Sequence, residues 1–245
     1  MTFTTDAVVL KITKTGESDR LLTLLTRDRG VIKAFAKAAN RPKNKLHMST
    51  NLFCYGSFTF YEGTSSLKVQ ECDLNDSFFA LQNDITALSL AQYFSELMIE
   101  AAPMETEAED FLRLYLNCIY LLANNKLPCE KIKCVFEMRL AVLSGYMPSV
   151  VGCSKCGEFE SDPMYFSLET GELFCYAHKA AGTNMYPLEV ITAVRHIVFS
   201  EFSAAMFSYK VTDKNQITLS KLCEKYLGGI IRKKLKTLDF YNSIK

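Results

Sequence analysis

Short apolar stretches separated by turn residues fill the first third of the chain. In SFTFYEG, Phe58 and Phe60 alternate with polar Ser57 and Thr59, which is the period of a strand with one buried face. Glycine-containing turn signals end most of these stretches. The predicted strands are Ala7–Ile12, Arg20–Thr26, Val31–Ala36, Phe53–Tyr61 and Leu67–Cys72. This pattern predicts a small barrel, and a five-stranded Greek-key barrel of the oligonucleotide-binding type has this size, although other small barrels share the strand count.

After Asn83 the period of the apolar positions changes to three- and four-residue steps, as on one face of a helix. The predicted helices run from Asn83 to Pro103, from about Glu105 to Ala123, from Pro128 to Gly145, from Pro187 to Phe199 and from Leu219 to about Lys236. Gly228–Gly229 is expected to break or kink the last of them. The predicted fold class is therefore α+β, with a small barrel, of the oligonucleotide-binding or another type, over residues 1–80 and a helical bundle over residues 81–245.

A cysteine segment interrupts the helical part. Its spacing C-x2-C-x18-C-x2-H offers four soft ligands in two close pairs, Cys153, Cys156, Cys175 and His178. Two residues between ligands let a tight turn aim both side chains at one ion, and YFSLETGEL predicts a hairpin that returns the second pair to the first. We expect an inserted zinc-ribbon-like finger over about residues 150–182. The alternative is four side chains that bind nothing.

Four protein ligands leave no position for water, so the finger predicts one structural Zn²⁺ and no catalytic centre. The chain has no His-x-Glu of the zinc-deaminase type and no H-E-x-x-H. The remaining cysteines lie mostly in apolar periodic segments, which is typical of reduced, core-filling thiols.

Composition narrows the class of protein further. Of the 245 residues 49% are hydrophobic and 22% charged, and the net charge is +1. The segments 1–80, 81–149 and 150–245 carry +3, −4 and +2, so the ends are basic and the middle is acidic. The chain contains no apolar run of membrane-spanning length and begins without a signal-peptide pattern, so we expect a cytoplasmic location and no membrane partner.

The strongest local charge lies between Arg27 and Leu46, where seven cations face the single acid Asp28. Arg41, Lys43 and Lys45 fall in a predicted loop directly after a strand, where cations can follow a phosphate backbone. A solvated charged face is the alternative. Six aromatic residues lie nearby, and alternation places most of them in the barrel core: Phe35, Phe53, Tyr55, Phe58, Phe60 and Tyr61.

Taken together, GESDRLLTLLTRDRG, VIKAFAKAANRPKNKL and FSLETGELFC with its paired ligands resemble the bacterial recombination mediator family RecO. The resemblance spans nearly the whole chain in order. It implies no catalytic centre and a DNA repair role at the bacterial nucleoid: binding of single- and double-stranded DNA, annealing of complementary strands, contact with the tail of single-stranded-DNA-binding protein, and loading of RecA together with RecR. It also implies a DNA-binding role for Arg20, Lys33, Lys37, Arg41, Lys43 and Lys45, and the zinc role of the four ligands.

The chain departs from the family pattern at four positions. Ala38 replaces a usual glycine, Asn40 a basic residue and Asn44 a serine, while His178 stands where many relatives carry cysteine. Histidine ligates zinc as cysteine does, so the last change keeps the metal site.

The sequence also suggests two further binding surfaces. A second cationic DNA surface is predicted at Arg232, Lys233, Lys234 and Lys236, although these charges also suit a helix C-terminus. Candidates for the cationic rim of a partner groove are Lys210, Lys214, Lys221 and Lys225. Two other classes stay open: a zinc-stapled protein-interaction scaffold that does not bind DNA, and a nucleic-acid-modifying enzyme built on the acids in ETEAED, which first suggest the opening turns of a helix.

Overall fold

The computed structural model describes residues 1–64 and 66–245. The chain forms two compact units, the first from Met1–Asn124 with Leu235–Lys245 and the second from Asn125–Lys234. The predicted domain boundary near residue 80 stays a prediction.

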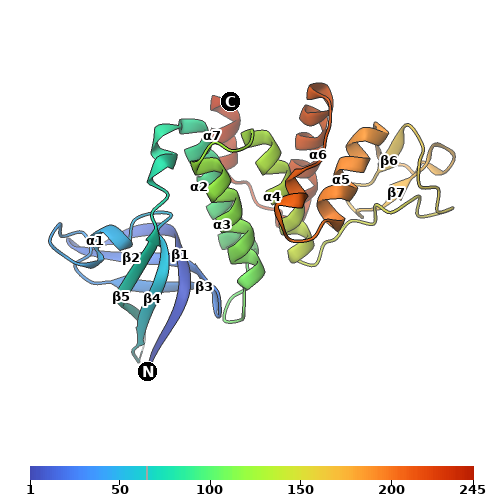
Figure 1. Cartoon of the computed structure of the whole chain (residues 1–245). Coiled ribbons are helices and arrows are strands. Elements are labelled where there is room, and N and C mark those ends of the chain that lie inside the picture. Colours follow the sequence, from blue (N-terminus) through green and yellow to red (C-terminus); the bar gives the residue numbers. More distant parts are fainter. Residues whose placement is uncertain (65) are drawn as a thin grey trace. The chain divides into compact units, whose positions relative to one another are not determined.

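The first unit begins with a closed barrel (Figure 1). Its strands are β1 (Thr2–Thr15), β2 (Asp19–Thr26), β3 (Gly30–Ala36), β4 (Tyr55–Glu62) and β5 (Leu67–Asp76), with the short helix α1 (Leu46–Ser49) after β3. The strand order is β1-β2-β3-β5-β4, closed by antiparallel β1–β4 pairing and a short parallel contact between β3 and β5. The predicted barrel of the oligonucleotide-binding type is thereby confirmed. Inward side chains from the strands, including Val9, Leu22, Phe58 and Phe60, form its core.

Helical elements complete the first unit: η1 (Phe79–Asn83), α2 (Ile85–Ala101), α3 (Glu109–Ala123) and α7 (Lys236–Ile244). Asp84 caps α2 by accepting hydrogen bonds from the N–H groups of Thr86 at 2.8 Å and Ala87 at 3.2 Å. A carboxylate oxygen of Glu96 on α2 likewise accepts from the N–H of Thr237, which fixes the first turn of α7.

The predicted start of the second helix at Glu105 is wrong, because α3 begins at Glu109. Glu105 has a φ of +58°, and its N–H donates to the carbonyl of Arg29 at 3.0 Å. The N–H of Ala108 donates to Arg27 at 2.7 Å. These bonds hold residues 105–108 against the β2–β3 turn, so of the acids in ETEAED only Glu109 and Asp110 lie in the first turn of the helix.

The second unit contains α4 (Cys129–Leu143), a finger formed by β6 (Met164–Phe166), β7 (Leu173–Phe174), η2 (Tyr176–His178) and β8 (Asn184–Tyr186), and then α5 (Leu188–Phe199), η3 (Ala204–Phe207) and α6 (Asp213–Ile231). The finger thus interrupts the helices, as predicted. Helices α4 and α6 are joined by Lys133, whose fully buried ammonium lies 2.9 Å from Glu137 and 2.8 Å from Glu224.

Of the break or kink predicted at Gly228–Gly229, the break is wrong, since α6 runs through both glycines to Ile231. Tyr226 and Leu227 are buried directly before them, and the Tyr226 hydroxyl donates to the carbonyl of Tyr146 at 3.0 Å. Packing of this face outweighs the helix-propensity cost of about 1 kcal/mol per glycine. The chain turns instead at Arg232, whose φ is +51°.

Candidate nucleic-acid interface and metal centre

The predicted DNA-binding cations gather around the end of β3. Lys33 lies on β3, Lys37 follows it, and Arg41, Lys43 and Lys45 lie in the segment 37–45, which we name the basic loop. All five side chains are exposed. Backbone turns order the loop: the N–H of Arg41 donates to Ala38 at 3.0 Å, and that of Asn44 to Arg41 at 2.9 Å. An ordered, exposed run of cations can attract phosphates without a large ordering cost.

Arg20, the sixth predicted cation, is placed differently. Its side chain is only 7% exposed, and burial lowers the pKa of its guanidinium. Nε donates to Oδ1 of Asn40 at 2.8 Å, and Nη1 donates to the hydroxyl of Thr50 at 2.9 Å and to Oδ1 of Asn51 at 3.1 Å. Nη1 also reaches the carbonyl of His47 at 3.1 Å. Arg20 therefore holds Asn40 of the basic loop, and the residues in and after α1, to the start of β2.

Two departures from the family pattern are explained by this arrangement. Asn40 accepts from Arg20 and donates from Nδ2 to the carbonyl of Asp19 at 3.2 Å. Asn44 accepts from the N–H of Leu46 at 2.8 Å and donates to the carbonyl of Lys37 at 3.3 Å. Both side chains hold the loop in shape. A third departure, Ala38, has a φ of +55°, a left-handed conformation that favours the glycine usual at this position.

Lys45 is the one basic-loop cation for which an ion pair is seen in the described part of the chain. Its Nζ lies 2.7 Å from Oε1 of Glu71 on β5, and both side chains are about two-thirds exposed. The hydrogen bond and charge of Lys45 lower the pKa of the Glu71 carboxyl. A phosphate would have to compete with Glu71 for Lys45, so Lys37, Arg41 and Lys43 are the more available cations.

Fewer of the nearby aromatic residues lie in the barrel core than predicted, since only Phe58 and Phe60 belong to its hydrophobic cluster. Phe53, Phe58 and Phe60 are buried, and Phe35 and Tyr55 are half-buried. Tyr61 on β4 is the most exposed of the six, at 43%.

The predicted second cationic surface lies where the chain passes from the second unit to the first. Arg232, Lys233 and Lys234 follow α6, and Lys236 begins α7; all four are exposed. Because α6 ends at Ile231, these charges are not carried by one continuous helix.

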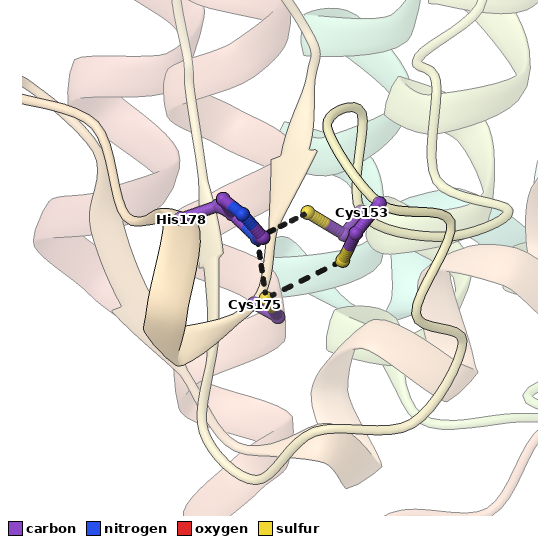
Figure 2. Close-up of side chains that lie close together, drawn as sticks. Cys153, Cys175 and His178 are labelled. Carbon is purple, nitrogen blue, oxygen red and sulfur yellow. Dashed lines mark hydrogen bonds between the residues drawn. The ribbon is translucent and has the colours of Figure 1, made fainter.

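The four predicted metal ligands come together in the finger. Figure 2 shows three of them, Cys153, Cys175 and His178, with their side chains pointing toward one another. The four ligand atoms all lie within 4.8 Å of one another. Sγ of Cys156 and Sγ of Cys175 are 3.8 Å apart, and Nδ1 of His178 lies 3.3 Å from Sγ of Cys175 and 3.9 Å from Sγ of Cys153. A tetrahedral ion with bonds of about 2.3 Å to sulfur and 2.0–2.1 Å to nitrogen requires edges of about 3.8 and 3.6 Å. The residues therefore fit a metal ion.

Local backbone structure positions the two ligand pairs. Gly157, with a φ of +78°, closes the first turn by donating its N–H to the carbonyl of Cys153 at 2.8 Å. The N–H of His178 donates to the carbonyl of Cys175 at 3.1 Å in the second turn. Antiparallel pairing of β6 with β7 places Cys175 directly after a sheet strand, which confirms the predicted hairpin.

The two buried cysteine thiols of the cluster differ in pKa. Burial raises the pKa of the Cys153 thiol, but backbone N–H groups of Cys175, Lys155 and Cys156 lower it by more, so it falls to about 6. The Glu158 side chain, followed by desolvation, raises the pKa of Cys175 to about 11. A bound cation would stabilise the thiolate form of every cysteine in the cluster.

Arg195 on α5 anchors both ends of the loop that carries the first ligand pair, a role that the sequence analysis did not predict. Its Nε donates to the carbonyl of Val150 at 2.6 Å, and Nη2 donates to the carbonyl of Phe159 at 2.7 Å. Its guanidinium also lies 4.1 Å from the centre of the Phe159 ring. One side chain thus holds both sides of the loop that carries Cys153 and Cys156.

A groove lies between β8 and α6, with a cavity of about 240 Å³. We name it the β8–α6 groove; it is lined by Asn184, Met185, Tyr186, Ile217, Thr218, Lys221 and Lys225. Met185 and Ile217 are both more than 60% exposed, an apolar pair that helix periodicity alone did not reveal. Of the four lysines predicted for a partner rim, Lys221 and Lys225 line this groove and Lys210 and Lys214 do not.

No helix in the described ranges, 1–64 and 66–245, has both the length and the apolar character needed to cross a membrane.

Both the N-terminal and the C-terminal part of the chain match models of known protein families. The family model "Recombination protein O N terminal" matches residues 1–78, and "Recombination protein O C terminal" matches residues 82–239. A DNA repair protein RecO from Acetivibrio thermocellus is 32% identical over 98% of this chain and 96% of its own length. Another from Clostridium novyi is 26% identical over 99% of this chain and 94% of its own. The chain therefore belongs to the RecO family of DNA repair proteins.

Proposed function

We propose that the chain is a recombination mediator that binds single- and double-stranded DNA and anneals complementary strands, without a catalytic step. Membership of a DNA repair family supports this function. The observation that carries it is the basic loop, an ordered and exposed run of cations on a barrel of the oligonucleotide-binding type.

In this mechanism Lys37, Arg41 and Lys43 neutralise phosphates, and Lys33 extends the track along β3. Arg20 acts as a positioning residue, because its guanidinium is already bonded to four acceptors of the protein. Neutralised phosphates repel a second strand less, which allows annealing. The stretch Arg232–Lys236 is the proposed second cationic surface.

The metal is proposed to be one structural Zn²⁺ held by Cys153, Cys156, Cys175 and His178. Three thiolates and one imidazole are a donor set that zinc prefers, and a filled tetrahedron leaves no position for chemistry.

The partner proposed for the β8–α6 groove is the tail of single-stranded-DNA-binding protein, an acidic peptide ending in an apolar residue. Lys221 and Lys225 supply charge for the acids, and Met185 and Ile217 supply apolar surface for the terminal side chain. Together with RecR, a protein bound in this way would help load RecA on coated DNA in the bacterial cytoplasm.

The test is annealing of complementary oligonucleotides, naked or coated with single-stranded-DNA-binding protein. We expect the loop variant K37E/R41E/K43E to lose annealing on both substrates. The control K126E/K210E/K214E makes the same change in net charge at exposed positions outside the loop and should retain it. Equal annealing by both variants would contradict the proposal. A wild-type protein that neither binds nor anneals DNA would favour the alternative, a zinc-stapled interaction scaffold.

A further inference from the structure

One wall of the β8–α6 groove belongs to the finger. Asn184, Met185 and Tyr186 of β8 line the groove, and the same three residues pair with Phe166, Tyr165 and Met164 of β6. The opposite wall, from Ile217 to Lys225, lies on α6. The groove is therefore a joint between the finger sheet and a helix.

Both ligand pairs are connected to β8 by short paths. Cys175 directly follows β7, which pairs with β6, and β6 pairs with β8. His178 precedes β8 by only six residues in the sequence. The N–H of Ser154, next to Cys153, donates to the carbonyl of Leu173 on β7 at 2.7 Å, which links the first ligand pair to the same sheet.

Around the ligands, the finger has only a small sheet and a small hydrophobic cluster of its own. Its strands are two or three residues long, and a sheet of this size is not stable alone. Its small hydrophobic cluster consists of Cys153, Phe174 and Cys175 with Tyr165 packed against it, so two of its members are themselves ligands. Structures of this kind usually depend on their metal for folding.

Aromatic contacts connect β6 of the finger to both walls of the groove. Phe166 of β6 lies edge-on to Tyr186 of β8 at 6.5 Å and to Tyr226 of α6 at 5.5 Å. Tyr186 is buried in this contact, whereas its neighbour Met185 points its exposed side chain at the groove.

We propose that the metal in the finger controls the β8–α6 groove: the ion holds β8 in place, and the groove binds an acidic, apolar-ended peptide only when the finger is loaded. This inference rests on the proposed function of the groove. The basic loop lies in the other unit, so DNA binding is expected to be independent of the metal.

The experiment uses the full chain, zinc-loaded or stripped with a chelator, and a fluorescent peptide rich in aspartate and ending in phenylalanine. We expect stripping to weaken peptide binding at least ten-fold while affinity for an oligonucleotide changes less than two-fold. In the loaded protein K221E/K225E should lose the peptide, and the matched reversal K210E/K214E, at exposed positions outside the groove, should not.

Hydrogen exchange provides a readout that does not need the peptide. On stripping, amides of residues 184–186 should exchange at least ten-fold faster, and those of β4 should be unchanged. Equal peptide affinity and equal β8 exchange with and without zinc would overturn the inference, as would loss of protection throughout the chain. A loaded protein that ignores the peptide but loses β8 protection on stripping would refute the tail-binding function and retain control of the groove by the metal.

Discussion

Nε of Arg20 donates a 2.8 Å hydrogen bond to Oδ1 of Asn40, which joins the start of β2 to the middle of the basic loop. The same guanidinium bonds to three further acceptors beyond the loop. The most buried cation of the predicted interface thus shapes the surface that the exposed cations present.

Replacement of Arg20 shows whether this residue positions the basic loop or contacts phosphates itself. R20K keeps the charge but cannot reproduce four hydrogen bonds, so we expect it to lower DNA affinity about as much as R20M. Each lost bond of a charged donor costs about 1.5–3 kcal/mol of stability, so both variants should also unfold at lower temperature. Affinity is measured by fluorescence anisotropy well below the unfolding transition. An R20K variant that binds DNA as the wild type does would identify Arg20 as a phosphate contact.

Ala38 stores backbone strain that glycine would relieve. Its φ of +55° costs a residue with a Cβ about 1–2 kcal/mol, a cost that glycine avoids. Glycine loses about 0.5–1 kcal/mol more conformational entropy on folding than alanine, and this offsets part of the gain. We expect A38G to stabilise the protein by about 0.5–1 kcal/mol in urea unfolding. A36G, in the regular strand β3, should destabilise it. Destabilisation by both changes would contradict the assigned backbone conformation.

Arg195 should tune the affinity of the finger for its metal. R195K loses the forked contact with Val150 and Phe159, which flank the first ligand pair without bonding to a ligand, so we expect metal affinity to fall by about ten-fold, the low end of the range for groups bonded to the ligands themselves. Metal transfer to a chromogenic chelator measures the effect. The control R139K alters an equally buried arginine that donates to carbonyls at the end of α5 instead. Similar metal affinities in the two variants would argue against a positioning role.

Removal of a ligand should empty the finger. We expect the wild type to bind one zinc ion per chain and C153S to bind it far more weakly, because the serine hydroxyl is a poor zinc ligand. Substitution of Cys72, a half-buried thiol of the barrel, should leave the stoichiometry at one. Chelation should lower the unfolding temperature of the wild type but not that of C153S. Equal zinc content in wild type and C153S would contradict the assigned ligand set.

The sequence was informative where local pattern decides structure. Alternation at Phe58 and Phe60 located a strand, and the spacing of Cys153, Cys156, Cys175 and His178 predicted a cluster of side chains that could hold a metal ion, because both signals lie in the spacing of residues along the chain. It misled where tertiary contacts override local preference. Gly228–Gly229 predicted a break that packing of Tyr226 prevents.

Contacts between distant segments were not predictable in the same way. Strand alternation places Arg20 on the same face as Leu22 and Leu24, but the acceptors that hold its buried guanidinium lie 20 to 31 residues away, where no local pattern reveals them. The same holds for Arg195, whose acceptors lie 36 and 45 residues away, and for Met185 and Ile217, which meet only when β8 lies beside α6.

The most direct test of the central claim, that DNA binds at the basic loop, is the affinity for a labelled single strand across a salt series. Log K should fall with log salt by about 0.7 per phosphate neutralised, so K37E/R41E/K43E should flatten the slope by about 2. The control K126E/K210E/K214E should keep the wild-type slope. Equal slopes for the two variants, or no binding by the wild type at low salt, would contradict the account.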